Sequence, residues 1–143
     1  CENINLNKNI TKKQKINLLK YIHKNKTSKL IESSLVLGAL TAKANNKNIE
    51  DLKNYGECLG LMFQLTDDIL DIIADKKKLG KSGSDIDNGK LTYPSIFGIQ
   101  KSQEFVKQLK EKGIKELAKI KTKNKKAEQI LIELLEYVEN RSY

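Results

Sequence analysis

A single proline, Pro94, interrupts a chain of 143 residues whose periodic segments all have the spacing of an α-helix. Apolar side chains recur three or four positions apart, and no segment shows the sustained alternation that marks a β-strand. We therefore predict an all-α fold in one domain over residues 1–143, a length sufficient to bury a core. The expected helices cover residues 12–24, 28–44, 50–77, 94–102, 104–121 and 126–140.

Two segments should separate these helices. The polar Asn25-Lys26-Thr27 is expected to be a junction between the first two, and residues 79–91 contain three glycines and cannot form a regular helix. Thr92 should cap the helix that follows, with Pro94 in its first turn.

Over residues 60–77, the expected helix at 50–77 carries its acidic residues on one side. At about 100° per residue, five polar side chains fall within a sector about 100° wide, and apolar residues fill most of the rest. These five are Gln64, Asp67, Asp68, Asp71 and Asp75. Such a helix should be largely buried.

A solvated face is the ordinary explanation for a run of charge, but two details argue against it. Asp67 and Asp71 repel each other across one helical turn, at a cost of about 0.2–0.5 kcal/mol. No lysine accompanies them on this face before Lys76, although Lys and Arg total 27. The cluster should therefore bind a hard cation, and Mg²⁺ accepts one or two carboxylates while keeping positions for water and phosphate oxygens.

Lysines follow the acidic residues directly: Lys76, Lys77, Lys78, Lys81 and Lys90. Magnesium beside several ammonium groups suits a di- or triphosphate ligand. A P-loop is excluded, because Gly83 and Gly89 are separated by five residues instead of four and Leu91 stands where Ser or Thr must follow Lys90.

In order and spacing these motifs resemble the second aspartate-rich region of the trans-isoprenyl diphosphate synthases. The region reads Phe63-Gln64-x-x-Asp67-Asp68-x-x-Asp71, then Gly80-Lys81, Asp85 and Gly89-Lys90-x-Thr92-x-Pro94. Other matching segments are the Lys-Thr segment His23-Lys24-Asn25-Lys26-Thr27, Leu37-Gly38-Ala39-Leu40, Tyr55-Gly56-Glu57-x-x-Gly60 and the terminal Tyr137-x-x-x-Arg141. The resemblance implies the C-terminal part of an isoprenoid-synthase-type helical bundle.

The resemblance also implies a role for each matching residue in a prenyltransferase of isoprenoid biosynthesis. Asp67 would bind Mg²⁺, with Asp71 and Asp68 completing or supporting the metal site. Asp85 would order waters or lysines around that site. Lys26, Thr27, Gln64 and Lys81 would hold the allylic diphosphate, and Lys90 would assist. Lys26 and Lys81 would act in catalysis by stabilising the departing diphosphate, and Arg141 would reach isopentenyl diphosphate.

One departure from the family is large. Members carry a first aspartate-rich motif on an earlier helix, whereas Asp67-Asp68 is the only adjacent aspartate pair in this sequence. We therefore expect the chain to be the C-terminal half of a polyprenyl synthetase and to be inactive alone. The family resemblance also implies a homodimer.

Two alternatives stay open. The net charge of +9 favours polyanions, and a basic helical nucleic-acid binder would use the lysines of 101–126, although Arg141 is the only arginine and tryptophan is absent. A non-catalytic subunit of a heteromeric prenyl synthase would explain the missing motif. We expect no nucleic acid as partner.

The remaining expectations concern location and single residues. No run approaches the ~20 apolar residues of a membrane span, so we expect a cytoplasmic protein, or one of an organelle stroma if the source is a eukaryote. Cys58 should lie in the core, and His23 should lie on the surface at a helix end.

Overall fold

The computed structural model describes residues 11–78, 91–122 and 124–141, and for residues 75–78 the helix backbone alone. The elements are α1 (Lys12–His23), the π-helix η1 (Lys24–Ser28), α2 (Lys29–Thr41), α3 (Asn46–Lys78), α4 (Tyr93–Phe97), α5 (Ile99–Ala118) and α6 (Lys125–Asn140). The regular structure of the described part is helical throughout, which confirms the predicted all-α fold.

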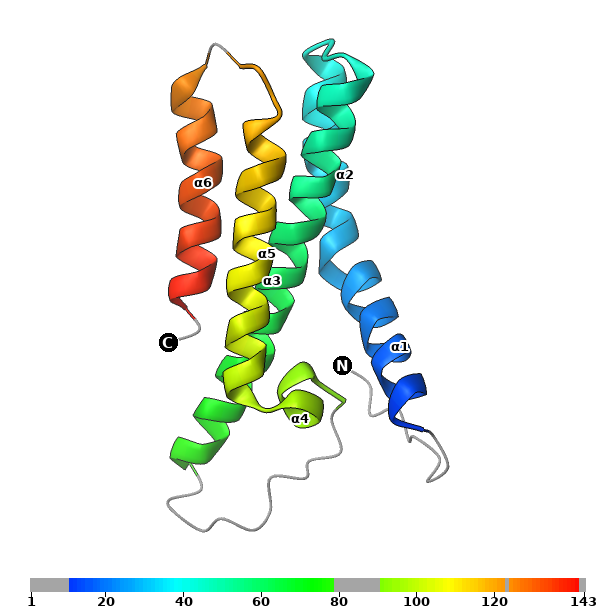
Figure 1. Cartoon of the computed structure of the whole chain (residues 1–143), viewed down its shortest axis with the longest axis vertical. Helices are drawn as coiled ribbons and strands as arrows, with labels where there is room; N and C mark the ends of the chain where they lie inside the picture. Colours follow the sequence, from blue (N-terminus) through cyan, green and yellow to red (C-terminus); the bar gives the residue numbers. More distant parts are fainter. Residues whose placement is uncertain (1–10, 79–90, 123, 142–143) are drawn as a thin grey trace.

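The long helix α3 is central and contacts every other element (Figure 1). On one side of it lies a helical arm made of α1, η1 and α2, with α2 beside the first half of α3. On another side lie α5 and α6, which run antiparallel to each other. The short α4 lies at the start of α5 and also contacts α3.

The main core forms where α3, α5 and α6 meet. Its buried apolar residues are Tyr55, Leu59, Met62, Leu65, Ile69, Val106, Leu117, Leu135 and Val138. Two buried hydroxyls on α3 add hydrogen bonds to the backbone of α6: Tyr55 to the Leu131 carbonyl at 2.8 Å, and Thr66 to the Val138 carbonyl at 3.3 Å. The prediction that the helix bearing the acidic residues is largely buried is confirmed.

A second seam joins α3 to the arm. Gly56 and Gly60 on α3 face Glu32 and Ser28 so closely that a side chain at either glycine would meet the backbone of the arm. The sequence pattern predicted close packing at these two glycines, and the structure confirms it.

Helix ends follow local chemistry where a cap is present. Thr92 caps α4 by accepting a hydrogen bond from the Ser95 amide at 3.2 Å, and Pro94 lies in the first turn as predicted. The predicted helix over 94–102 is wrong, because Gly98 adopts a φ of 84°, which ends α4 and starts α5 at Ile99. A short break at Gly98 thus replaces the one expected near residue 103.

The expected junction at Asn25-Lys26-Thr27 is also wrong. These residues are helical and form part of η1, a wider turn that joins α1 and α2 into one arm. Polar residues do not interrupt the helix here, because η1 packs against α3.

Several large apolar side chains remain exposed in the described structure. They are Tyr21, Leu30, Leu37 and Leu40 on the arm, and Ile130, Leu134 and Tyr137 on α6. Within the described ranges, the helices include none that is both long and apolar enough to span a membrane.

Candidate functional site

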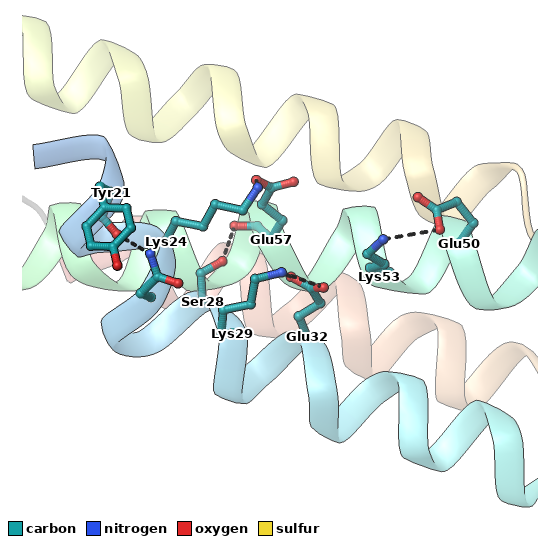
Figure 2. A network of polar contacts seen from close by, with 9 residues as sticks. Tyr21, Lys24, Ser28, Lys29, Glu32, Glu50, Lys53 and Glu57 are labelled. Atoms are coloured by element: carbon teal, nitrogen blue, oxygen red, sulfur yellow. Dashed lines mark hydrogen bonds and ion pairs between the residues drawn. The ribbon is translucent and has the colours of Figure 1, made fainter. Parts of the chain in front are cut away.

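The predicted Lys-Thr segment lies in η1, and both ends of this π-helical turn are attached to one residue of α3. Lys24, the first residue of η1, pairs with the Glu57 carboxylate at 3.3 Å. Ser28, the last residue, donates a hydrogen bond to the Glu57 backbone carbonyl at 3.2 Å (Figure 2). Single π-helical turns of this kind often occur at functional sites. The two contacts fix the position of Lys26 and Thr27 relative to α3.

A chain of polar contacts then crosses from the arm to α3. The Thr27 hydroxyl donates to Gln64 Oε1 at 3.3 Å, and Gln64 Nε2 donates to Asp68 Oδ1 at 3.2 Å. His23 Nε2, from the end of α1, lies 3.1 Å from the other Asp68 oxygen. His23, Gln64 and Asp68 are all buried. We call these four residues the Thr27–His23 chain.

Asp67 faces a different neighbour from Asp68. Its Oδ1 accepts a hydrogen bond from Arg141 Nη2 at 3.2 Å, and the Arg141 guanidinium lies 5.2 Å from the centre of the Phe63 ring. Burial raises the pKa of Asp67, Arg141 opposes this shift, and the like charges of Asp71 and Asp68 add to it. The environment of Asp67 thus disfavours negative charge despite the arginine.

The acidic sector therefore divides between two surroundings. Gln64 and Asp68 are buried against the arm, Asp67 is half-buried beside the end of α6, and Asp71 is exposed. A fully solvated face, the ordinary alternative, does not describe Gln64 and Asp68. The side chain of Asp75, with Lys76, Lys77 and Lys78, lies outside what is described.

The structure brings together some of the predicted site residues. Thr27, Gln64 and Asp68 are in contact, Lys26 precedes Thr27 on an exposed position of η1, and Asp67 and Arg141 form a pair. Lys81, Asp85 and Lys90 lie outside the described residues.

Sequence reasoning missed His23. We expected a surface residue, but its side chain is 3% exposed and faces Asp68, while its ring lies 5.4 Å from that of Tyr93. A signal was available: His23 follows the buried Leu19 by four positions, so both fall on the same face of α1. A polar residue on the apolar face of a helix requires a buried partner.

Asp67 and Asp71 are the two predicted metal ligands that are not fully buried. Among residues 11–74, 91–122 and 124–141, no three His, Cys, Asp or Glu side chains are grouped as a ready-made metal site. Mg²⁺ does not need such a group, since it binds through one or two carboxylates together with water and phosphate oxygens. Burial and like-charged neighbours raise the pKa of Asp67, and a divalent cation beside it would offset both effects.

Comparison with known proteins identifies the family. The polyprenyl synthetase family profile matches residues 2–134. Geranylgeranyl pyrophosphate synthase 4 of Arabidopsis thaliana is 41% identical over 126 residues, which are 87% of this chain and 33% of that protein. A heterodimeric geranylgeranyl pyrophosphate synthase large subunit 1 of the same plant, named chloroplastic, is 47% identical over 92 residues, 64% of this chain and 25% of that protein.

A solved structure agrees on the fold. The geranyltransferase from Helicobacter pylori 26695 superposes with a TM-score of 0.60 at 24% identity, over 96% of this chain and 41% of that one. The chain therefore spans a third or less of the length of these two plant relatives and less than half of the bacterial structure. Together with the acidic motif on α3 and the Lys-Thr turn beside it, the profile match establishes that this chain belongs to the polyprenyl synthetase family.

Proposed function

We propose that this chain supplies the allylic-diphosphate side of a prenyltransferase that condenses an allylic diphosphate with isopentenyl diphosphate. The observation that carries the proposal is the contact between the Lys-Thr turn and the acidic helix, in which Thr27 donates to Gln64 at 3.3 Å. This contact brings the Thr27 hydroxyl and its exposed neighbour Lys26 to the Gln64 amide, on the helix that also bears Asp67 and Asp71. These are donor groups and carboxylates of the kinds that bind a metal diphosphate.

In the proposed reaction, the carbon–oxygen bond of the allylic substrate breaks and both electrons leave with the diphosphate. Mg²⁺, when bound, would supply charge stabilisation for this anion. Asp67 and Asp71 would hold the ion, with Asp68 behind them. Lys26 would hold the diphosphate oxygens and stabilise the leaving group as its charge develops, and the single hydroxyl proton of Thr27 would turn from Gln64 to the diphosphate when it binds.

The other predicted residues complete the proposal. Lys81 and Lys90 would add positive charge to the leaving group, Asp85 would orient groups behind the metal carboxylates, and Arg141 would reach isopentenyl diphosphate. Isopentenyl diphosphate then attacks the allylic carbon through its double bond, and loss of a proton restores neutrality at carbon. An apolar wall must keep water from the cation during these steps.

We further propose that the chain works as one part of a larger helical assembly and is inactive alone. The chain corresponds to a third or less of the length of the plant synthases it matches. The leucines that α2 leaves exposed, Leu30, Leu37 and Leu40, form a surface that the additional helices of a complete synthase would cover. A further helix with its own carboxylates would then face α3.

The assembly state and the compartment are proposals of the same kind. A homodimer is the family expectation, and one relative is named as the large subunit of a heterodimer. That relative is also named chloroplastic, which favours an organelle stroma over the cytoplasm. The expectation that nucleic acid is not a partner stays a prediction.

Calorimetric titration of the chain with inorganic pyrophosphate, with and without Mg²⁺, tests the proposed site. Binding should require the metal and weaken about tenfold in Thr27→Val, because a hydrogen bond to a charged group is lost. Thr41→Val, at the far end of α2, is the matched control and should bind normally. No binding by the wild-type chain would contradict the proposed site.

An assay of prenyl transfer tests the proposed inactivity. The purified chain should give no product from dimethylallyl or geranyl diphosphate and isopentenyl diphosphate. Turnover above background would show that no further helices are needed.

A further inference from the structure

His23 is the only histidine of the chain, and the structure buries it at the junction of α1 and η1. Its Nε2 lies 3.1 Å from Asp68 Oδ2, and its ring packs against Tyr93 of α4. Among the described residues, its Nδ1 has no hydrogen-bond partner. Removing an imidazole and a carboxylate from water costs free energy unless the two groups compensate each other. The contact with Asp68 is therefore the main polar interaction of this side chain.

Asp68 has both carboxylate oxygens directed at protein groups. Oδ1 accepts from Gln64 Nε2 at 3.2 Å, and Oδ2 lies 3.1 Å from His23 Nε2 as an ion-pair contact that lacks hydrogen-bond geometry. The residue is 8% exposed, whereas Asp71, one turn further along α3, is exposed. Asp68 is thus enclosed by protein groups and Asp71 is accessible to solvent, although both are aspartates on the same side of α3.

Gln64 depends on Asp68 for its orientation. Because its Nε2 donates to Asp68, its Oε1 is turned toward the Thr27 hydroxyl. An amide with both ends engaged cannot rotate without breaking a buried hydrogen bond. The order of contacts from His23 through Asp68 and Gln64 to Thr27 therefore runs from the end of α1 back to η1, by way of α3.

We propose that His23 is a positioning residue that holds Asp68 inward, so that Asp68 fixes Gln64 and Gln64 fixes the Lys26-Thr27 turn. In this arrangement Asp68 joins the two halves of the Thr27–His23 chain, and Asp67 and Asp71 are the carboxylates that the proposed function assigns to a metal ion. The proposal rests on the proposed function in one respect, the diphosphate ligand of Lys26 and Thr27. The contacts themselves can be tested without any ligand.

The single imidazole makes a direct test possible. In the ¹⁵N-labelled chain, long-range ¹H–¹⁵N spectra report the protonation and tautomer of His23 alone. Asp68→Asn should shift both ring nitrogen signals, because it replaces the charged group facing Nε2. Asp71→Asn is the matched control and should leave them in place. Imidazole signals that do not respond to Asp68→Asn would overturn the proposal.

Hydrogen exchange tests whether the contact positions the turn. The amides of Lys26, Thr27 and Ser28 should exchange about tenfold faster in His23→Leu, because the variant leaves the buried Asp68 carboxylate without its ion-pair partner, a loss worth at least about that factor. His23→Gln, whose amide nitrogen can replace Nε2, should restore protection to within about threefold of wild type. Equal protection in His23→Leu and wild type, or no rescue by His23→Gln, would refute a positioning role. If His23→Leu fails to fold, Asp68→Asn takes its place in the exchange measurement, and unchanged protection there refutes the role equally.

Binding of Mg²⁺ with pyrophosphate separates this proposal from the proposed function. If the wild-type chain binds, His23→Leu should bind about tenfold more weakly and His23→Gln should bind nearly as wild type. Equal binding by His23→Leu would overturn the link from His23 to the ligand site. If the wild-type chain does not bind, the proposed function fails for this chain, and the spectra and the exchange rates still decide the role of His23.

Discussion

Gly60 of α3 lies so close to Ser28 of η1 that a Cβ atom on Gly60 would come within 2.3 Å of the Ser28 Cα atom. The atom it would meet is backbone, which cannot rotate out of the way as the end of a long side chain can. The hydrogen bond from Ser28 to Glu57 lies at the same contact. The absence of a side chain at Gly60 therefore sets how closely the Lys-Thr turn approaches α3.

Gly60→Ala should destabilise the chain by about 1–3 kcal/mol, the usual cost of adding a group to a closely packed contact. Gly38→Ala is the matched control: Gly38 also lies in a helix, but nothing lies within 4 Å of the position of its Cβ. That variant should gain about 0.5–1 kcal/mol, because alanine favours helix over glycine. Urea unfolding measures both, and a neutral Gly60→Ala would disprove the close contact.

Asp67→Asn should make the chain more stable at neutral pH. Burial and the neighbouring carboxylates raise the pKa of Asp67 in the folded state above its unfolded value of 3.8. The folded state thus binds this proton more tightly, so the free energy of unfolding falls as pH rises from 3.8 through the raised pKa. The advantage of the variant should disappear below pH 3.8.

Thermal unfolding from acid to neutral pH checks this expectation, with Glu50→Gln on the exposed start of α3 as the control. A pH-independent difference between wild type and Asp67→Asn would contradict it. The same variant should weaken binding of Mg²⁺ with pyrophosphate. A gain in stability with a loss of binding is the pattern expected of a functional carboxylate.

Tyr55→Phe should cost about 1 kcal/mol, because it removes the buried hydrogen bond from the Tyr55 hydroxyl to the Leu131 carbonyl. Tyr21→Phe is the control, since Tyr21 is 68% exposed. Equal stability of the two variants in urea would mean that the Tyr55 hydroxyl contributes nothing to the attachment of α6.

Cys58 should resist alkylation in the folded chain. Burial raises the pKa of its thiol to about 11, with Lys112 opposing the shift and Glu57 and Glu116 adding to it. At about pH 8 the reactive thiolate is then roughly a thousandth of the total. In the Cys1→Ser variant, iodoacetamide should label Cys58 slowly in the native chain and rapidly in urea. Rapid native labelling would contradict the predicted core position.

The helices could largely be predicted from the sequence, because periodic apolar residues determine the buried face of a helix. The position of Cys58 in the core followed from the same pattern, and Thr92 was recognised as a cap from its residue type and the proline that follows. Helix breaks were predicted less well. The apolar pattern does not mark the positive φ of Gly98, and the polar turn at Asn25-Lys26-Thr27 is helical because η1 packs against α3.

The site was only partly predictable for a related reason. The acidic sector on α3 followed from helical geometry, but its division between two neighbours depends on tertiary contacts. Asp68 contacts His23, and Asp67 contacts Arg141. Both contacts join residues that are distant in the sequence. The one local indication of the contact between His23 and Asp68 was that His23 shares a helix face with Leu19.

The π-helical turn also has a consequence for protein engineering and for sequence alignment. A π-helical turn holds one more residue than an α-helical one, and each residue rotates an α-helix by about 100°. Because the turn already holds the additional residue, deleting one residue between Lys24 and Ser28 would close it to α-helical geometry and keep Leu19 and His23 facing α3. When relatives are compared, a gap of one position at this turn therefore leaves the inward and outward residues of α1 in register.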